Sequence, residues 1–213
     1  MNLRANYSKR IRLSLAFSIV AMTVCAQSIW NAEHLEQVKK SLNQPAYNAT
    51  YLNLLKQADK ALNMEKLDLN CMVSEVWEES MMIDESHRYE FQGTENEACV
   101  LGDMAMIKQS VRVFVQNAAK YSESGTTIIL GVKEEPGYVS YMIEDEGTGM
   151  NPGDLAHIFD RFYRSDEARN SETGGSGLGL SIAKWIVDAH GGTIQVISRE
   201  DIGSRFVVRF PAC

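Results

Sequence analysis

The chain has 213 residues, of which 45% are hydrophobic and 23% charged, which is enough for one well-buried domain with additional segments. Its formal net charge of −7 argues against a general nucleic-acid-binding surface, which is normally basic, and we expect no nucleic-acid partner. The four cysteines show no CxxC spacing and therefore predict reduced or buried thiols instead of a disulfide framework or zinc site: Cys25, Cys71, Cys99 and Cys213.

The N-terminal 30 residues contain an uncharged run, residues 13–30, that follows a basic stretch ending at Arg12. The run just reaches the length of a membrane span, and Trp30 stands where an interfacial anchor is expected. We expect a membrane-spanning segment. A cleaved signal peptide and a buried or interfacial helix remain alternatives, because Ser and Thr make the run only moderately apolar.

Residues 31–67 are predicted to be helical, with an interruption at Pro45. Leu52, Leu55, Ala58 and Leu62 then recur at helical spacing and form a narrow apolar stripe. Such a stripe suits a two-helix seam or a helix packed on its own domain. Residues 64–70 are interpreted as a link into a second unit, residues 68–213.

The second unit contains helices and strands that do not alternate regularly. Apolar periodicity predicts helices over 71–83, 103–121, 154–162 and 176–189, and strands over 88–91, 126–132, 138–145, 193–198 and 205–210. This order does not suit a doubly wound parallel sheet. We predict an α+β fold, a two-layer sandwich of a mixed or antiparallel sheet with helices on one face.

A glycine-rich segment, "GGSGLG" at 174–179, precedes the last predicted helix. It does not fit the dinucleotide fingerprint, and it lacks the Gly-Lys-Ser/Thr ending of a P-loop. Gly175, Gly177 and Gly179 nevertheless lie where helix N–H groups favour an anion. Phosphate binding and a flexible loop are equally compatible with this segment.

The strand predicted at 138–145 ends in an acidic residue. Val139, Tyr141, Ile143 and Asp145 alternate onto one face, so the carboxylate of Asp145 points toward the core and requires a partner. The glycines at 147 and 149 leave space beside it, and the exocyclic amine of adenine would satisfy the carboxylate. The alternative is a strand-end Asp that caps the following loop.

The long helix predicted at 103–121 carries a polar triplet near its end. Asn117, Lys120 and Tyr121 share one face because they are spaced i, i+3 and i+4. An amide oxygen suits Mg²⁺ and a lysine suits phosphate, so the triplet is compatible with a magnesium triphosphate.

The segments discussed above belong to a set of four motifs that follow one another along the chain: "VQNAAKYS" (115–122), "DEGTGM" (145–150), "IFDRFYRSD" (158–166) and "GGSGLGLSIAKWIVDAHGG" (174–192). With "GSRF" at 203–206 they resemble the catalytic ATP-binding domain of sensor histidine kinases, over about residues 68–211. The resemblance implies a Bergerat-type sandwich that binds Mg-ATP under a lid.

The resemblance also implies roles for single residues. Asn117 would bind Mg²⁺ and Lys120, next to Tyr121, would bind phosphate. Asp145 would accept from the adenine amine, with Gly147 and Gly149 as the wall beside it and Ser204 close to adenine. The lid and phosphate loop would involve Gly175, Gly177, Leu178 and Gly179, with Phe159, Phe162 and Tyr163 as anchors and Arg161 and Arg164 either reaching the γ-phosphate or exposed to solvent.

The chain departs from the family pattern at two places. Val113 replaces the first asparagine of the usual N box, and no histidine is followed by the acidic residue and proline of a family-type acceptor. His34 is only a weak acceptor candidate because Leu35 follows it. We therefore expect ATP binding, with phosphate transfer to a histidine hairpin in trans more readily than self-phosphorylation.

The partners implied by the resemblance are a response regulator receiver domain, an acceptor-histidine hairpin and a second copy of the chain. The catalytic unit would lie in the cytoplasm, attached to the membrane through residues 13–30 or free. A cytoplasmic N-terminus and one span would instead place it outside, where nucleotide is scarce.

Two other functions remain as alternatives. One is a non-catalytic, nucleotide-gated binding module of the same fold. The other is an ATP hydrolase of the gyrase or heat-shock chaperone type, which would need a glutamate on the long helix ahead of Asn117; no acidic residue lies between Asp103 and Asn117.

Overall fold

The computed structural model describes residues 62–164 and 177–213, which belong to one compact unit, Leu62–Cys213. The uncharged run at 13–30, most of the segment predicted to be helical at 31–67, His34 and Gly175 lie outside the described residues. No helix within the described ranges combines the length and the apolar character needed to cross a bilayer.

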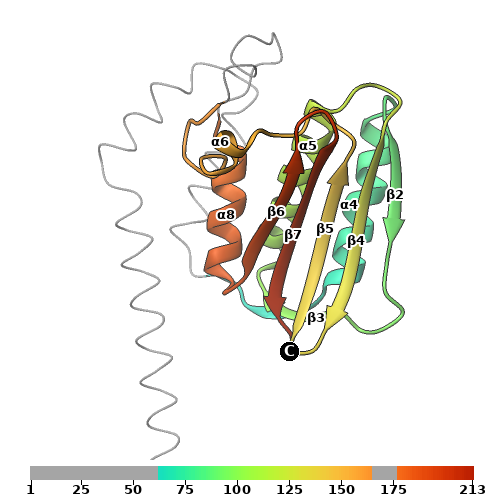
Figure 1. Cartoon of the computed structure of the whole chain (residues 1–213). Helices are drawn as coiled ribbons and strands as arrows, with labels where there is room; N and C mark the ends of the chain where they lie inside the picture. The colour runs from blue at the N-terminus through green and yellow to red at the C-terminus, as the bar shows by residue number, and fades with distance from the viewer. Residues whose placement is uncertain (1–61, 165–176) are drawn as a thin grey trace, which may run out of the picture. The chain divides into compact units, whose positions relative to one another are not determined.

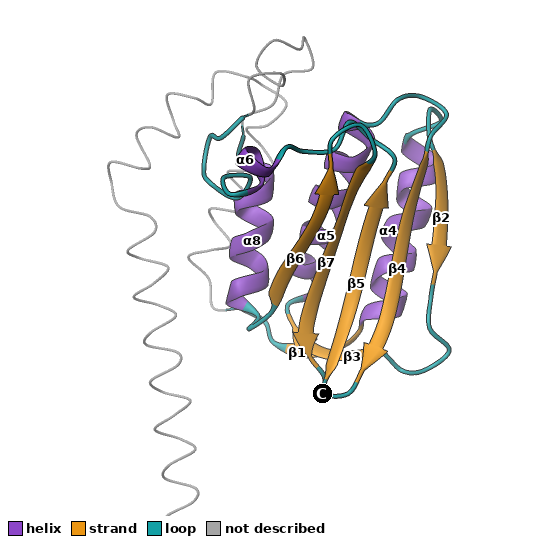
Figure 2. Ribbon diagram, in the orientation of Figure 1, coloured by secondary structure: helices purple, strands orange, loops and turns teal. Residues whose placement is uncertain are grey.

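A five-stranded mixed sheet forms one layer, in the order β2-β4-β5-β7-β6 (Figure 1). Its strands are β2 (Arg88–Gln92), β4 (Thr127–Glu135), β5 (Tyr138–Asp145), β6 (Thr193–Arg199) and β7 (Gly203–Pro211). β2 pairs with β4 in parallel and the other neighbours are antiparallel. Helices α4 (Leu69–Ile83), α5 (Met104–Tyr121) and α8 (Gly179–Ala189) cover one face (Figure 2). The predicted two-layer α+β sandwich is confirmed.

The two long helices each begin after an aspartate that caps the first turn. The side chain of Asp68 accepts a hydrogen bond from the main-chain N–H of Asn70 at the start of α4, and Asp103 accepts one from Met106 at the start of α5. Each carboxylate satisfies an N–H group that has no partner within the helix. The predicted helix at 103–121 therefore has the observed bounds within one residue.

The core lies between the sheet and α5. Val139, Tyr141 and Ile143 on β5 are buried, as the alternation predicted, and so are their β7 neighbours Phe206, Val208 and Phe210. The ring of Phe114 on α5 lies 4.9 Å from that of Phe206 and 6.2 Å from that of Tyr141, measured between centroids. Helical and strand periodicity thus converge on one apolar layer.

Some predicted helix faces differ from the buried ones. Helical spacing predicts that Met104 shares the apolar face of Ile107 on α5 and that Met81 shares that of Val73 on α4, but both methionines are exposed. On α8 the buried residues are Ala183, Ile186 and Val187, so the predicted stripe of Ile182, Trp185, Ile186 and Ala189 is rotated. The rotation of a helix about its axis is set by its contacts with the sheet, which spacing alone does not specify.

Three elements differ from the predictions. Residues 64–70 contain β1 (Glu65–Asp68), which pairs antiparallel with β3 (Cys99–Gly102), so the predicted link is wrong. The predicted helix at 154–162 is reduced to α6 (Pro152–Leu155) followed by turns. Strands of four residues show too few alternations to be distinguished from a loop.

The cysteine prediction is wrong for two residues. Cys99 and Cys213 form a disulfide with their Cα atoms 5.4 Å apart, although 114 positions separate them in the chain. The main-chain N–H of Cys213 also donates to the carbonyl of Cys99 at 3.1 Å. Of the described cysteines, Cys71 is free and exposed. Only the approach of the C-terminal residues to β3 brings the bonded pair together.

A hydroxyl pair joins α5 to the sheet inside the core. Ser110 donates to the carbonyl of Ile107 at 2.7 Å, so the 2.8 Å contact with Tyr141 must use the phenolic proton of Tyr141.

In Ser110→Ala the Tyr141 hydroxyl is buried without a partner, which we expect to cost about 1–3 kcal/mol of unfolding free energy. Urea unfolding should show a smaller loss of unfolding free energy for Tyr141→Phe than for Ser110→Ala. The double variant should lose less than the sum of the two single losses. Additive losses would contradict the pairing.

Candidate functional site

A cavity of about 520 Å³ opens at the end of the compact unit where α5 and β5 terminate. Its volume is in the range of small-molecule sites. The loop after β5, α6 and the turns after it, the start of α8 and the β6–β7 turn complete its walls. The predicted site residues that line it are Asn117, Lys120, Tyr121, Asp145, Gly149, Arg164 and Ser204.

Asp145 lies at the end of β5 and is only 7% exposed. Its Oδ1 accepts main-chain hydrogen bonds from Gly147 at 3.0 Å and from Ser204 at 3.1 Å. Its Oδ2 accepts none from any described residue, and the side chain lines the cavity. Both sequence interpretations therefore hold in part: one carboxylate oxygen caps the following loop, and the other is available to a ligand.

Burial raises the pKa of Asp145, and the hydrogen bonds from Gly147 and Ser204 oppose that rise. A buried carboxylate with one unused oxygen requires a donor, because the desolvation of the charge is otherwise uncompensated. No side-chain cation of the described residues forms an ion pair with it. The missing partner is the observation that points to a ligand.

The glycines after Asp145 are required by the protein's own backbone, and of the two only Gly149 lines the cavity. A side chain at Gly147 would meet the carbonyl of Tyr121, and one at Gly149 (φ 67°) would meet the backbone of Arg199. The N–H of Thr148 donates to the Tyr121 carbonyl at 3.0 Å, which joins the loop to α5. Gly147 does not line the cavity. The absent Cβ atoms allow close chain packing, so Gly147 shapes the wall only indirectly, whereas Gly149 forms part of it.

The polar triplet of α5 faces the cavity as its spacing predicts. Asn117, Lys120 and Tyr121 all line it, and the Lys120 Nζ lies 4.9 Å from the centroid of the Tyr121 ring. The Asn117 amide makes no hydrogen bond with any described residue, so its oxygen is available to a cation. Val113, which replaces the first asparagine of the usual N box, is buried, and its Cγ1 would lie 3.5 Å from a Cβ added at Gly179.

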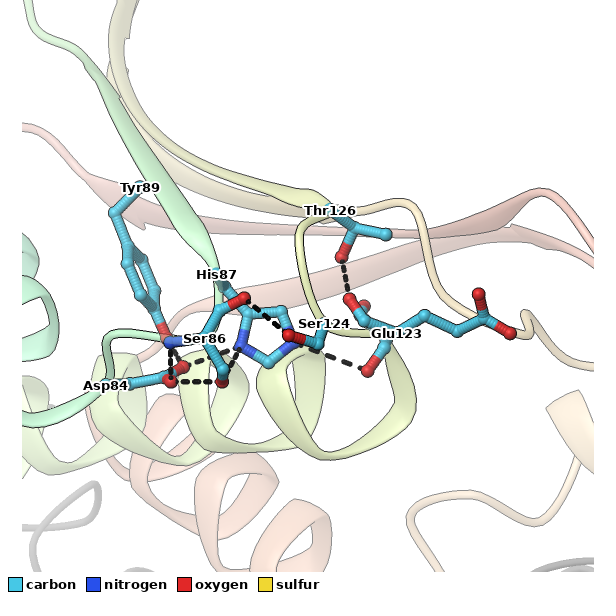
Figure 3. A network of polar contacts seen from close by, with 8 residues as sticks. Asp84, Ser86, His87, Tyr89, Glu123, Ser124 and Thr126 are labelled. Atoms are coloured by element: carbon cyan, nitrogen blue, oxygen red, sulfur yellow. Dashed lines mark hydrogen bonds and ion pairs between the residues drawn. The ribbon is translucent and has the colours of Figure 1, made fainter.

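A network that sequence reasoning missed holds the end of α5 (Figure 3). Asp84 accepts from Tyr89 at 2.7 Å and lies 2.7 Å from His87 Nδ1, and His87 Nε2 lies 3.3 Å from the Ser122 carbonyl. Burial opposes ionisation of Asp84, but bonds from Ser86, Tyr89 and His87 outweigh it and hold the pKa of Asp84 far below its usual range. The network ties α4 and β2 to the residue after Tyr121.

The residues after α6 pack on the core and on the start of α8. Phe159 contacts the core cluster, and the N–H of Phe162 (φ 63°) donates to the carbonyl of Gly177 at 3.0 Å. Gly177 has φ 68°, and a Cβ there would lie 2.8 Å from the Phe162 carbonyl carbon. Phe159, Phe162 and Gly177 thus support the wall, as do Leu178 and Gly179, without lining the cavity.

Further residues line the cavity that the sequence motifs did not single out for binding. Tyr163, predicted as an anchor, donates to Asp154 Oδ1 at 2.5 Å, which joins the turns after α6 to its start. Apolar side chains of Met150, Ile158 and Leu180 form part of the wall. The remaining lining residues are Ser122 and Thr148, which lie inside quoted motifs but were assigned no role, and five residues outside the motifs: Glu123, Asn151, Asp154, Glu200 and Asp201.

The cavity therefore presents two chemically different regions. Asp145 and Ser204 offer hydrogen-bond acceptors at one part of the wall, and Asn117, Lys120 and Arg164 offer an amide and two cationic side chains elsewhere. A flat ring with an amino group, attached to a polyanion with a hard cation, matches this combination.

Comparison with known proteins defines the class. Residues 102–213 match the family described as histidine kinase-, DNA gyrase B-, and HSP90-like ATPase. The match covers more than half of the chain, which therefore belongs to this ATPase family.

The chain is similar in sequence to sensor histidine kinases. The chain is 33% identical to the sensor-like histidine kinase SenX3 of Mycobacterium tuberculosis over 162 residues, covering 76% of this chain and 40% of that protein. It is 32% identical to the sensor histidine kinase CusS of Escherichia coli over 218 residues, covering 99% of this chain and 45% of that protein. The chain thus spans less than half the length of these relatives.

Solved structures agree in fold. The mycobacterial sensor histidine kinase MprB matches with a TM-score of 0.60 and 27% identity, covering 70% of this chain and 97% of that one. The histidine kinase domain of the E. coli osmosensor EnvZ matches with a TM-score of 0.54 and 30% identity, covering 73% and 92% respectively.

Proposed function

We propose that the chain contains the ATP-binding catalytic module of a two-component sensor histidine kinase, which transfers the γ-phosphoryl group of Mg-ATP to a histidine. The observation that carries the proposal is the buried Asp145 carboxylate, whose Oδ2 has no donor among the described residues and which lines a cavity shared with Asn117 and Lys120. Membership of the ATPase family supports it.

Each residue has a defined task in this proposal. Asp145 accepts a hydrogen bond from the adenine amine, and Met150, Ile158 and Leu180 cover apolar ligand surface. Asn117 would hold Mg²⁺, which neutralises phosphate charge when bound. Lys120 and Arg164 orient the phosphates. Phosphoryl transfer depends mainly on positioning and charge stabilisation, so these residues supply most of the rate.

The phosphate acceptor is proposed to be a histidine hairpin in trans, because no histidine of this chain has the family-type sequence around it. Among the described histidines, His190 is buried and the side chain of His87 is held between Asp84 and Ser122. His157 is exposed but pairs with Asp160 at 2.8 Å. The residue after His87 is Arg88 and the residue after His157 is Ile158, whereas the family pattern has an acidic residue there. We propose three partners: an acceptor-histidine hairpin in trans, a second copy of the chain in a dimer, and a response regulator receiver domain that takes the phosphoryl group from the histidine.

The location follows from the same chemistry. We propose that the catalytic unit lies in the cytoplasm, where ATP is available, and that residues 13–30 attach it to the cell membrane. The compact unit itself begins at Leu62, well after this segment.

Two measurements test the function. Calorimetric titration with ATP, with and without Mg²⁺, should show binding that Mg²⁺ strengthens. Incubation with γ-labelled ATP and an isolated acceptor-histidine hairpin of a related kinase should give an acid-labile, base-stable phosphate on the hairpin, and none on a hairpin whose histidine is replaced by alanine. Binding without transfer would favour the nucleotide-gated binding module, and absence of binding would overturn both.

A further inference from the structure

Three residues form a row across neighbouring strands beside the cavity. Asp145 of β5 lies opposite Ser204 of β7, and Ser204 lies opposite Ser198 of β6. Asp145 and Ser204 line the cavity, whereas Ser198 stands one strand behind them. Ser204 is only 8% exposed, and its N–H group donates to Asp145 Oδ1 at 3.1 Å. Ser198 is therefore adjacent to the Asp145–Ser204 pair but does not itself line the cavity.

The hydroxyl groups of Ser198 and Ser204 lie 2.9 Å apart, and Ser198 Oγ also donates to the Gly203 carbonyl at 3.0 Å. A serine hydroxyl has one proton, and a carbonyl oxygen only accepts. Since the Ser198 proton goes to Gly203, the bond between the two hydroxyls uses the proton of Ser204. The Ser204 hydroxyl then has lone pairs, and no proton, left for the cavity.

We infer that Ser198 is a specificity-determining positioning residue, which makes Ser204 an acceptor and thereby biases the site toward adenine over guanine nucleotides. This inference rests on the proposed function. The main-chain N–H groups of Gly147 and Ser204 are already used by Asp145 Oδ1. The Asp145–Ser204 pair thus offers acceptors alone to a ligand.

The two purines differ at the position that such a pair would recognise. Adenine carries an amino group there, which donates, and guanine carries a carbonyl oxygen, which accepts. A guanine in the same pose would place its oxygen against the lone pairs of Ser204 and the carboxylate of Asp145. Buried groups left unpaired in this way discriminate strongly between otherwise similar ligands.

The test compares ADP and GDP affinities, measured by calorimetry on the full chain. In Ser198→Ala the Ser204 hydroxyl loses its acceptor and is free to donate to the guanine oxygen. We expect the preference for ADP over GDP to fall about tenfold, the effect of one hydrogen bond, mainly through tighter GDP binding. Ser198→Thr keeps the hydroxyl and should retain the wild-type preference.

A double variant tests whether altered packing, and not the Ser204 hydroxyl, causes the change in GDP affinity. Ser198→Ala combined with Ser204→Ala has no hydroxyl left to donate, so the gain in GDP affinity should disappear. A wild-type chain that prefers ADP, with the same preference in Ser198→Ala, would overturn the inference alone. A gain that persists in the double variant would also overturn it. A wild-type chain that binds neither nucleotide would overturn the proposed function.

Discussion

Replacing Asp145 with asparagine is expected to weaken adenine-nucleotide binding on the order of 100-fold. A hydrogen bond to a charged group contributes about 1.5–3 kcal/mol, and about 1.4 kcal/mol corresponds to tenfold in affinity. The amide oxygen would still accept from Gly147 and Ser204, so the NH₂ group would occupy the place of Oδ2 and meet the adenine amine as a second donor. Calorimetric titration with ADP measures the loss.

The same variant should leave the ligand-free fold intact or more stable. Because burial raises the folded-state pKa of Asp145 above its ordinary value of 3.8, the folded chain binds more protons than the unfolded chain in the window above that value. Its contribution to stability is therefore largest at low pH and falls as pH rises through the window. Asp145→Asn removes this dependence, which thermal unfolding at several pH values would reveal.

Nucleotide affinity should change with pH in the opposite direction. Protonation removes the acceptor that the adenine amine requires, so the wild-type affinity is expected to fall as pH decreases through the raised pKa of Asp145. If Asp145→Asn bound ADP as tightly as the wild type, the carboxylate would have no role in recognition and the assignment of the cavity would be wrong.

Replacing Asn117 with alanine is expected to remove the magnesium-dependent part of nucleotide binding. The amide lines the cavity and makes no hydrogen bond within the described residues, so its loss creates no unpaired partner in the protein. A metal ion supplies several kcal/mol of charge stabilisation in phosphoryl transfer, so we expect phosphate transfer to a hairpin to fall on the order of 100-fold. Affinity for ADP without Mg²⁺ should change little.

The adjacent Gln116 provides a matched control. It is an amide on the same helix, but it is exposed and does not line the cavity, so Gln116→Ala should respond to Mg²⁺ like the wild type. Parallel titrations of ATP with increasing Mg²⁺ distinguish the two variants. An equal Mg²⁺ response in Asn117→Ala and Gln116→Ala would show that another residue holds the metal.

Local periodicity was sufficient for much of the fold. The alternation along β5 predicted its buried face, and it turned Asp145 inward because side chains two residues apart share a face of a strand. Helical spacing likewise placed Asn117, Lys120 and Tyr121 on the cavity side of α5. Periodicity also placed the long helix at 103–121, within one residue of the observed Met104–Tyr121. Each of these features depends on residues close in sequence.

Other features required the tertiary structure. Asp145 and Ser204 are separated by 59 positions in the sequence, and Cys99 and Cys213 by 114. Local residue spacing therefore could not predict either contact. The glycines at 147 and 149 are needed because α5 and the end of β6 approach the loop, which no motif states. The sequence by itself determined which side chains of β5 face inward and which face of the end of α5 carries the polar triplet, because these follow from local spacing. The register between distant strands decided which of them meet, because that register depends on packing across the whole sheet.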